Sequence, residues 1–296
     1  MRHAVLGGGK RIRPCLLFAI AKSAAASAPT SAQLDFASRA ACAIELIHCA
    51  SLVHDDLPCF DDADTRRGRP STHAAFGESN ATLAGDALIV LAFEALADPD
   101  APLPHGRLAL VHRLARATGS AEGIIGGQGL EDVLASSAGP DGPFASDAVE
   151  RYHELKTAAL FRLAAHAGAM SADAEHVDQW ADLGSRLGLA FQLADDLLDV
   201  EGPDNLGKPT GQDAAHDRPN QVLCSGRHAT RARFVALLDE AITQVMELAE
   251  DPGPMLAFIG RLADVLRPQG DAAVTQGRRP TPIAGQAQPD ASRMGT

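Results

Sequence analysis

Aromatic residues are scarce in this chain, and lysine is rarer still. Only 4% of the 296 residues are Phe, Trp or Tyr, although 46% of all residues are hydrophobic. The chain is long enough for one large helical domain, and its core must be built mainly from Ala, Leu, Val and Ile. Lysine occurs only at Lys10, Lys22, Lys156 and Lys208, so arginine is the ordinary cation here. A lysine in such a chain is a candidate for a required point charge.

The chain also lacks the features of a secreted protein, a membrane protein or a metal-thiolate protein. It has no charged-then-apolar leader and no run of about 18 apolar residues that would span a bilayer. The five cysteines are odd in number and form no CxxC pair, which is typical of reduced thiols. A net charge of −12 argues against nucleic acid or an anionic membrane as the main partner. We therefore expect a cytoplasmic protein without a transmembrane segment and without nucleic acid as a partner.

Helical periodicity is present almost throughout, and no stretch alternates with period two. Helices are predicted over residues 31–57, 81–97, 146–170, 176–200 and 229–249. The first of them follows a capping box, Thr30 to Gln33, and is stopped by Pro58.

The remaining segments are expected to be loops or a tail. Residues 98–106 and 136–145 are rich in Pro, Gly and Ser, which is typical of interhelical loops. Residues 267–296 hold Gln, Pro, Gly, Ala and Thr without periodicity, so we expect a disordered tail there. The fold class that follows is all-α, with a single domain over residues 1–266.

Two aspartate clusters end two of the predicted helices. Their members are Asp55, Asp56, Asp61 and Asp62 in the first, and Asp195, Asp196 and Asp199 in the second. A solvated acidic helix end is the simpler interpretation of either cluster alone, but apolar residues lead directly into both. Two carboxylates about 5 Å apart repel by about 3 kcal/mol at an effective dielectric of 20, so such clusters usually hold a cation. Oxygen donors without His or Cys select Mg²⁺, whose coordination is completed by water and phosphate oxygens.

The helical spacing places polar residues beside these acids. Gly184, Gly188, Gln192, Asp195 and Asp199 are predicted to share one stripe of an otherwise apolar helix. On the earlier helix, His48 precedes Asp55 by two turns and shares its face.

Cations accompany the acids along the chain. Three of them, Lys10, Arg11 and Arg13, follow a run of glycines that would allow close backbone approach to a ligand. Arg66 and Arg67 follow the first acid cluster, Lys156 interrupts an apolar helix, and Lys208 follows the second cluster. A surface salt-bridge network is the alternative. Acids, a hard metal ion and clustered cations near an apolar helix bundle instead favour a site for a diphosphate that carries a hydrocarbon tail.

The chain contains, in this order, the strings GGGKRIRP, SLVHDDLPCFDDADTRRGRP, GGQ, LKT, and GLAFQLADDLLDV followed by LGK, which extend from about Leu6 to about Leu223. These strings resemble the trans-isoprenyl diphosphate synthase (polyprenyl synthetase) family. The resemblance implies a single-domain all-α bundle around a deep apolar cavity, usually a homodimer. It implies an enzyme that joins isopentenyl diphosphate to an allylic diphosphate.

The resemblance also implies a role for each residue that matches a motif. Three Mg²⁺ ions would be coordinated by Asp55, Asp61 and Asp195, with Asp56 and Asp199 acting from behind these ligands or through water. The allylic diphosphate would be bound by Arg66, Lys156 and Lys208. Isopentenyl diphosphate would be bound by Lys10, Arg13, His48 and Arg67. Thr157 and Gln192, together with Lys156, would act on the developing allylic cation.

Product length is expected to depend on the residue five places before the first aspartate. In the family a large aromatic there stops the product at C15. Here the position is Ala50, preceded by Cys49, and the Pro58-Cys59 spacer is similar to that of geranylgeranyl diphosphate synthases. We therefore expect a C20 product, with C15 as the alternative if another residue blocks the cavity.

Four departures from the family pattern qualify the match. The chain starts a few residues before the glycine–lysine motif, where relatives usually have one or two more helices. Glu131 stands where relatives often have Asp, Arg218 stands where many have a second lysine, and the tail lacks a basic end. Two other functions are therefore kept open. A class I terpene cyclase also ionises a prenyl diphosphate, and a non-catalytic partner subunit of a related synthase would share the fold.

Overall fold

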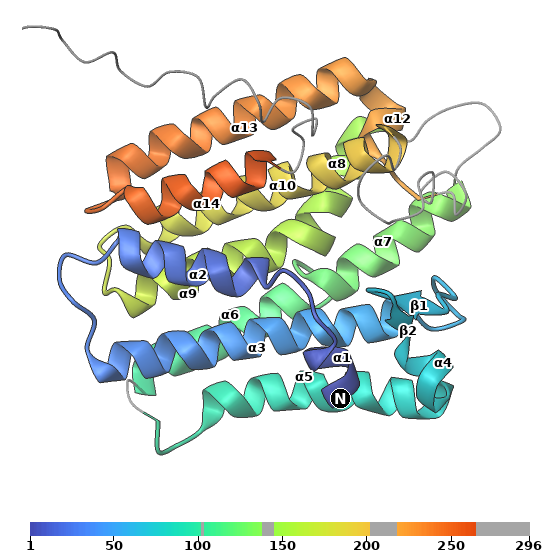
Figure 1. Cartoon of the computed structure of the whole chain (residues 1–296), viewed down its shortest axis with the longest axis horizontal. Coiled ribbons are helices and arrows are strands. Elements are labelled where there is room, and N and C mark those ends of the chain that lie inside the picture. The colour runs from blue at the N-terminus through green and yellow to red at the C-terminus, as the bar shows by residue number, and fades with distance from the viewer. Residues whose placement is uncertain (102–103, 138–144, 202–217, 265–296) are drawn as a thin grey trace, which may run out of the picture. The chain divides into compact units, whose positions relative to one another are not determined.

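The computed structural model describes residues 1–101, 104–137, 145–201 and 218–264. Its helices lie side by side in a bundle, with one short β-hairpin at an end of it (Figure 1). The elements are α1 (Arg2–Leu6), α2 (Ile12–Ser23), α3 (Ser31–Asp55), β1 (Thr65–Arg66), β2 (Arg69–Pro70), α4 (Thr72–Phe76), α5 (Glu78–Ala97), α6 (Pro104–Thr118), α7 (Ile124–Ser137), α8 (Ser146–His153), the π-helix η1 (Glu154–Ala158), α9 (Ala159–Ser171), α10 (Val177–Glu201), α12 (Gln221–Ser225), α13 (Arg227–Leu248) and α14 (Gly253–Ala263). The all-α fold class is confirmed.

The capping box predicted at the start of α3 is confirmed. Gln33 N donates to Thr30 Oγ1 over 3.2 Å, and Thr30 N donates to Gln33 Oε1 over 2.8 Å. These two bonds satisfy backbone donors that the first helical turn leaves without partners. At the other end, Leu57 N donates to His54 O over 3.0 Å, and Pro58 follows outside the helix.

The helix predicted over residues 146–170 is one continuous run with a π-helix in its middle. Helices α8 and α9 flank η1, so one extra residue is inserted into the helical turn at Glu154–Ala158.

The loops expected over residues 98–106 and 136–145 are shorter than predicted. α6 already begins at Pro104, because Pro is well accommodated in a first helical turn, and α7 continues to Ser137.

The hairpin β1–β2 was not predicted. Thr65 pairs with Pro70 and Arg66 with Arg69, with Arg67 and Gly68 between them at φ 56° and 72°. Two positive φ angles are the geometry of a two-residue turn whose twist matches that of paired strands. Strands of two residues are too short to show alternation, so a search for period two passes over them.

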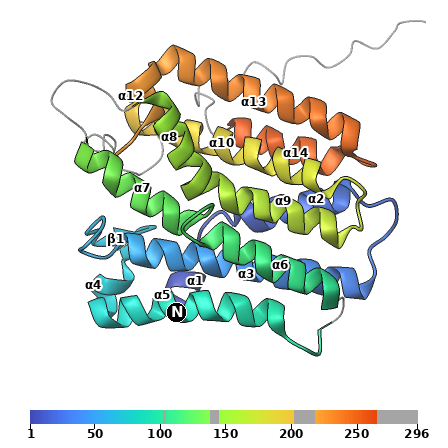
Figure 2. The ribbon, with the colours of Figure 1, turned by 180° about the vertical axis from the view of Figure 1, so that it is seen from behind.

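The core contains mainly Ala and Leu, as composition requires. α3 lies against α2, α5 and α9, while α10 lies against α9 and α13 (Figure 2). The largest fully buried side chain is the single tryptophan, Trp180 of α10, which is 1% exposed. Small residues let these helices approach closely; a Cβ on Gly168 of α9 would lie 2.5 Å from Leu17 O. All these elements belong to one unit, Met1–Leu266. The tail expected over residues 267–296 lies outside the described residues.

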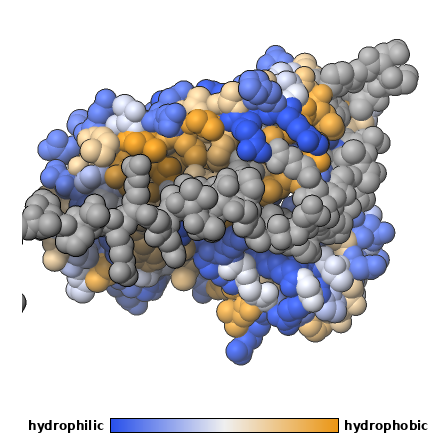
Figure 3. Space-filling view, turned by 45° about the horizontal axis from the view of Figure 1, so that its top comes forward, coloured by the Kyte–Doolittle hydropathy of each residue, from blue (hydrophilic) through white to orange (hydrophobic). Residues whose placement is uncertain are grey.

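Two helices, α3 and α5, are long and apolar enough to cross a membrane by length and composition. The expected absence of such a segment is therefore not confirmed. Over the most apolar stretch of each helix, α3 is 56% buried inside the protein, whereas α5 is only 28% buried. Apolar residues also reach the surface elsewhere, and the face in Figure 3 has a hydrophobic band bordered by hydrophilic residues. The exposed apolar residues of α5 are Leu83, Val90 and Leu91, and those of α13 are Val235, Ile242 and Met246.

Candidate active site

Both acid-bearing helices end on the same side of the bundle. The C-termini of α3 and α10 lie at the end of the molecule where α7, α12 and the β1–β2 hairpin are also found (Figure 1, Figure 2). The C-terminus of a helix carries a partial negative charge. Carboxylates at two such ends therefore create a strongly negative region that attracts cations.

The chain turns back after α3 and returns Asp61 to Asp55. Asp61 N donates to Asp55 O over 2.9 Å, and Asp62, at φ 48°, adopts the left-handed conformation that this turn requires. Burial raises the pKa of Asp55 to about 6, Lys156 opposes this rise, and the carboxylates of Asp61 and Glu131 add to it. Asp55 therefore faces two other carboxylates as well as a lysine.

Asp56 is paired with Arg66. Its carboxylate is buried, at 2% exposure, and accepts from Arg66 Nε over 2.8 Å and from Arg66 Nη2 as well. Burial raises the pKa of Asp56, and the hydrogen bonds from Arg66 oppose the rise. Arg66 Nη2 also lies 3.9 Å from Asp61 Oδ2. Arg66, which is predicted to bind the allylic diphosphate, is therefore held beside Asp61 by its pairing with Asp56.

Two of the four departures from the family pattern, Glu131 and Arg218, contact each other. Glu131 of α7 is 4% exposed and accepts from Tyr152 Oη over 2.9 Å and from Lys156 Nζ. Arg218 Nε lies 3.8 Å from Glu131 Oε1, and Arg218 Nη2 is paired with Asp61 Oδ1. Glu131 and Arg218 thus form one charged network with Lys156 and Asp61.

Lys156 and Thr157 lie on the π-helix, and two glycines allow it to pack. A Cβ on Gly127 of α7 would lie 2.5 Å from Lys156 N, and a Cβ on Gly188 of α10 would lie 2.6 Å from Ala158 Cα. Both contacts are with backbone, so a side chain at either position would require η1 to move. Gly127 of the GGQ string and Gly188 of α10 thus have a packing explanation, because they enclose η1 from two sides.

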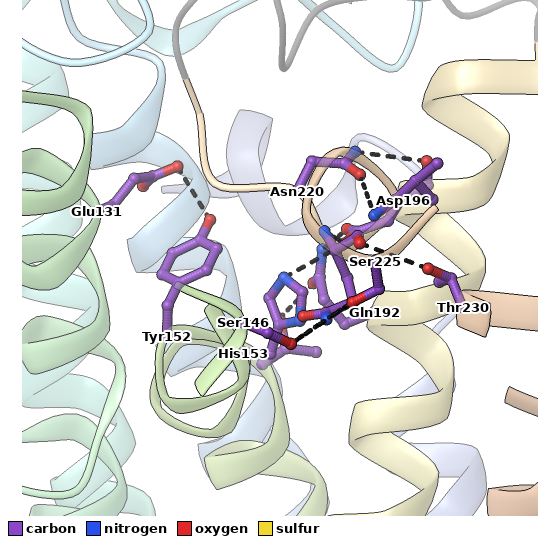
Figure 4. A network of polar contacts seen from close by, with 12 residues as sticks. Glu131, Ser146, Tyr152, His153, Gln192, Asp196, Asn220, Ser225 and Thr230 are labelled. Atoms are coloured by element: carbon purple, nitrogen blue, oxygen red, sulfur yellow. Dashed lines mark hydrogen bonds and ion pairs between the residues drawn. The ribbon is translucent and has the colours of Figure 1, made fainter. Parts of the chain in front are cut away.

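A chain of hydrogen bonds joins η1 to α10. Thr157 Oγ1 donates to Gln192 Oε1 over 2.7 Å, and Gln192 Nε2 donates to Asp196 Oδ1 over 2.9 Å. Figure 4 shows Gln192 and Asp196 with His153, whose Nε2 lies 3.4 Å from Asp196 Oδ2. Burial and Lys156 lower the pKa of His153 to about 3, so this imidazole is neutral.

The structure adds the buried Asp196 to the residues of α10 that were expected to act. Gly188, Gln192 and Asp196 face η1 and its neighbours, and Asp196 is 1% exposed. Asp195 is exposed and Asp199 is partly buried. The ridge from Gly188 through Gln192 to Asp196 follows steps of four residues, whereas the predicted stripe takes a step of three from Gln192 to Asp195. Lys208, expected beside this cluster, lies outside the described residues.

The predicted binding residues for isopentenyl diphosphate are largely brought together. Burial lowers the pKa of His48 well below its usual value, and Arg13, Arg67, Arg11 and Arg66 lower it further, in that order. Four guanidinium groups therefore place positive charge near the buried His48 imidazole, and positive charge of this kind is suited to an anion.

Arg13 and Arg67 show most clearly how this cluster is built. Arg13 Nε is buried and has no hydrogen-bond partner, and burial lowers the pKa of its guanidinium to about 10. Arg67 Nη1 donates to Gly8 O, and its guanidinium occupies the space that a Cβ on Gly9 would need, with contacts of 2.5 to 2.8 Å. Gly9 has a φ of 112°, which also favours glycine. Lys10, the fourth predicted residue, is exposed.

Sequence reasoning named Arg11 among the cations that follow the glycines but gave it no role, and it missed Glu45. Arg11 pairs with Glu45 Oε1, which is 8% exposed, and donates to Val5 O. Glu45 is the only charged residue in the apolar run between Arg39 and His48, and that isolation was the available signal. An acid in the middle of a core helix needs a partner, because burying an unpaired charge is costly.

The donor set fits a hard divalent cation. Among the described residues, no group of three or more His, Cys, Asp or Glu side chains lies close enough together to bind a metal ion. The carboxylates of the first cluster lie beside the cations of Lys156, Arg66 and Arg218. Carboxylate oxygens without nitrogen or sulfur suit Mg²⁺. The predicted ion positions stay predictions.

The two residues predicted to determine product length are buried. Cys49 and Ala50 are each 1% exposed and pack in a small cluster with Val53, Leu57, Ala81 and Leu88, between α3 and α5. The deep cavity expected from the resemblance stays a prediction.

Known proteins are similar to this chain over most of its length, in sequence and in fold. Residues 1–251 match the polyprenyl synthetase family. The chain is 43% identical over 274 residues to the geranylgeranyl diphosphate synthase of Cereibacter sphaeroides, covering 92% of this chain and 88% of that protein. It is 41% identical over 259 residues to the farnesyl diphosphate synthase of Escherichia coli, covering 84% and 82%. A geranyltransferase from Helicobacter pylori, solved with magnesium and isoprenyl diphosphate, has a TM-score of 0.76 and 30% identity over 90% of this chain and 86% of that one.

The family match spans most of the chain, and the family is magnesium-dependent. The fold, the acid-bearing helix ends and the arginine cluster agree with that match. This chain therefore belongs to the polyprenyl synthetase family and is an enzyme that transfers prenyl groups, a trans-prenyl diphosphate synthase.

Proposed function

We propose that this enzyme condenses isopentenyl diphosphate with an allylic diphosphate and releases a C20, geranylgeranyl product. The C–O bond of the allylic diphosphate breaks, and its electron pair leaves with the diphosphate. The C3–C4 double bond of isopentenyl diphosphate then forms the new C–C bond. A proton leaves the adduct for the released diphosphate, which restores a double bond.

The observation that carries the proposal is a pair of oppositely charged sites joined by Arg66. On one side, Arg66 is paired with Asp56 and lies 3.9 Å from Asp61 in the acidic cluster. On the other, its positive charge contributes to the lowered pKa of His48, after the larger contributions of Arg13, Arg67 and Arg11. An acidic site suits a diphosphate that arrives with metal ions, and a basic site suits one that arrives without them. Adjacent sites of both kinds support a reaction between two diphosphates.

The residues of the acidic site have distinct tasks in this proposal. Asp55, Asp61 and Asp195 would hold three Mg²⁺, assisted by Asp56 and Asp199. When bound, these ions would neutralise the charge that accumulates on the leaving diphosphate. Lys156, Arg66 and Lys208 would contact the same diphosphate. Their cations lower the cost of breaking the C–O bond by opposing that charge.

The other residues bind the second substrate and protect the cation. Arg13, His48, Arg67 and Lys10 would hold isopentenyl diphosphate, and the buried Arg13 Nε has a hydrogen-bond donor to offer it. Thr157 and Gln192 direct oxygen atoms toward the developing cation. The apolar helices around them exclude water that would otherwise capture it. Five cysteines without a disulfide are consistent with the cytoplasmic location included in this proposal.

The test is incubation of the purified chain with isopentenyl diphosphate and each short allylic diphosphate, followed by chromatographic sizing of the product. Mg²⁺-dependent formation of a C20 diphosphate by this chain alone supports the proposal. Only C15 product would refute the chain length. Product formation without isopentenyl diphosphate would indicate a terpene cyclase. No turnover by the chain alone would favour the non-catalytic partner subunit, although both aspartate clusters are intact.

We predict that Ala50→Tyr shortens the product to C15. Ala50 is a small, buried residue between α3 and α5, and a tyrosine there would fill space that a longer prenyl chain needs. A graded series is the sharpest measurement: Ala50→Ser should retain C20, and Ala50→Leu should give a mixture. Overpacking costs about 1–3 kcal/mol, so thermal melting should accompany the product analysis. A C20 product from a folded Ala50→Tyr variant would show that a residue other than Ala50 limits the length of the product.

We also propose that the enzyme is a homodimer in which a second copy covers α5. The exposed apolar residues of α5 are unusually prominent: Leu83 is 65% exposed and Val90 is 66% exposed. Contiguous exposed apolar side chains on one helix are typical of a protein interface.

Val90→Glu should convert the dimer to a monomer, because a buried, unpaired carboxylate at an interface is costly. Sedimentation velocity measures the change. Val235→Glu on α13 is the matched control, since Val235 is a surface valine at 49% exposure. Dissociation by Val235→Glu and not by Val90→Glu would move the interface to α13 and contradict the proposal.

A further inference from the structure

Asp196 differs from the other acids of its cluster in how completely the protein surrounds it. It is 1% exposed, and protein groups donate to both of its carboxylate oxygens. Gln192 Nε2 donates to Oδ1 over 2.9 Å, and Gln221 N donates to Oδ2 over 2.7 Å. Figure 4 shows this carboxylate among polar side chains from α8, α10 and the start of α12. Asp196 is thus directed into the protein.

These hydrogen bonds determine which way the Gln192 amide points. An ionised carboxylate only accepts hydrogen bonds, so it must face the amide NH₂ of Gln192. The amide oxygen then faces Thr157, whose hydroxyl donates to it over 2.7 Å. Thr157 has one hydroxyl proton, and this bond uses it. The remaining lone pairs of Thr157 Oγ1 and Gln192 Oε1 are therefore available to the site beside them.

The orientation matters because the reaction develops positive charge. Dipoles whose negative ends already face a developing cation stabilise it without reorganising. If the Gln192 amide were rotated by 180°, its NH₂ would face Thr157, and the hydroxyl proton would turn outward. Both groups would then present positive ends to the cation.

We propose that Asp196 is a positioning residue that fixes the Gln192–Thr157 dipoles toward the developing cation, and does not hold a metal ion. The inference rests on the proposed function of Gln192 and Thr157. It separates Asp196 from its neighbours Asp195 and Asp199, which are less buried. The connection to Gln221 N also anchors the start of α12, three residues after Arg218, which pairs with Asp61.

Asp196→Asn is the direct test. Gln221 N is a fixed donor, so the asparagine must turn its oxygen to Gln221 and its NH₂ to Gln192. Two NH₂ groups cannot bond each other, and the Gln192 amide must rotate. We expect kcat to fall about 10²-fold, while the KM of each diphosphate and the half-saturating Mg²⁺ concentration change less than about threefold. Asp199→Asn is the matched contrast and should raise the Mg²⁺ requirement.

A reversal of hydrogen-bond polarity provides the rescue. Gln192→Glu alone places two carboxylates face to face and should be nearly inactive. In the double variant Asp196→Asn with Gln192→Glu, the amide of the introduced asparagine donates to one oxygen of the glutamate, and the other oxygen accepts from Thr157. The negative end again faces the cation, so we expect kcat to recover at least about tenfold over each single variant.

The outcomes separate the inference from the function on which it rests. Wild-type chain that forms no condensation product overturns both. An active wild type whose Asp196→Asn variant needs much more Mg²⁺ overturns the inference alone, because that is the behaviour of a metal ligand. A double variant no better than the single variants overturns it as well. Thermal melting identifies variants that do not fold. If Asp196→Asn does not fold, the inference is tested by whether the kcat of the double variant exceeds that of Gln192→Glu.

Discussion

Asp55→Asn should abolish turnover and at the same time stabilise the metal-free protein. We expect kcat to fall about 10³-fold, because the variant removes one proposed ligand of the ions that neutralise the leaving diphosphate. The stability effect follows from the environment of Asp55. Burial raises its pKa to about 6, and the carboxylates of Asp61 and Glu131 contribute to the rise. The metal-free site thus holds a carboxylate that would be more stable protonated, and asparagine resembles the protonated form.

The sign of the pH dependence follows from the raised pKa. Below about pH 4, Asp55 is protonated in the folded and unfolded states, and the variant and wild type should unfold with equal free energies. Between about pH 4 and 6 the unfolded state loses the proton first, so the wild type loses stability as the pH rises. Above about pH 6 the variant should be more stable by about 1–2 kcal/mol, a value reduced for the partial solvation of the site.

Thermal melting with and without ligands measures both parts of this prediction. Mg²⁺ with a non-ionisable allylic diphosphate analogue should stabilise the wild type and not the variant, since only a state that binds ligand gains from it. The order of stability should therefore reverse on adding the ligands. Asp62→Asn is the matched control: Asp62 is exposed, and asparagine tolerates its φ of 48°. An Asp55→Asn variant within about tenfold of wild-type turnover would contradict the assignment of Asp55 as a ligand.

The two acid clusters and the arginines could be predicted because the residue types themselves indicate the chemistry. Asp55, His48 and Arg13 belong to strings whose composition already indicates a metal ion and an anion. α3 could be bounded because Thr30, Gln33 and Pro58 act locally on the backbone. Short-range chemistry was sufficient for α3, but it was not sufficient for the β1–β2 hairpin, whose two-residue strands show no alternation.

Three other features could not be predicted because they depend on contacts between distant segments. The π-helix η1 has the same apolar pattern as an α-helix, and Gly127 and Gly188 reveal it only once they lie against it. Asp196, and not Asp195, continues the buried face of α10, because neighbouring helices follow a ridge of four-residue steps. The pairing of Arg218 with Asp61 joins residues that the sequence separates by more than half of the chain.

Gly127→Ala should reduce kcat about 10²-fold by displacing Lys156. The new Cβ would lie 2.5 Å from Lys156 N and 2.7 Å from its Cα, and both are backbone atoms that cannot rotate away. Relief of that overlap requires η1 to move by roughly 1 Å, and a misplacement of that size near the reacting centre costs about 10²-fold in rate. The overpacking should also destabilise the protein by about 1–3 kcal/mol.

Gly129→Ala on the same helix separates this effect from a general change in α7. No atom lies within 4 Å of its added Cβ, so this variant should keep wild-type turnover. It should gain about 0.5–1 kcal/mol of stability, since alanine is the better helix former. Wild-type turnover by a folded Gly127→Ala variant would show that the π-helix tolerates displacement.

Gly188→Ala tests whether the two glycines act on one element. Its Cβ would lie 2.6 Å from Ala158 Cα, on the α10 side of η1. If α7 and α10 together hold the π-helix in position, each single variant can relieve its overlap by shifting η1 away, toward the opposite glycine. The double variant removes that freedom, so its loss of stability should exceed the sum of the single losses by about 1 kcal/mol or more. Strict additivity would mean that the glycines act separately, and that Lys156 and Thr157 owe their positions to the hydrogen bonds with Glu131 and Gln192 alone.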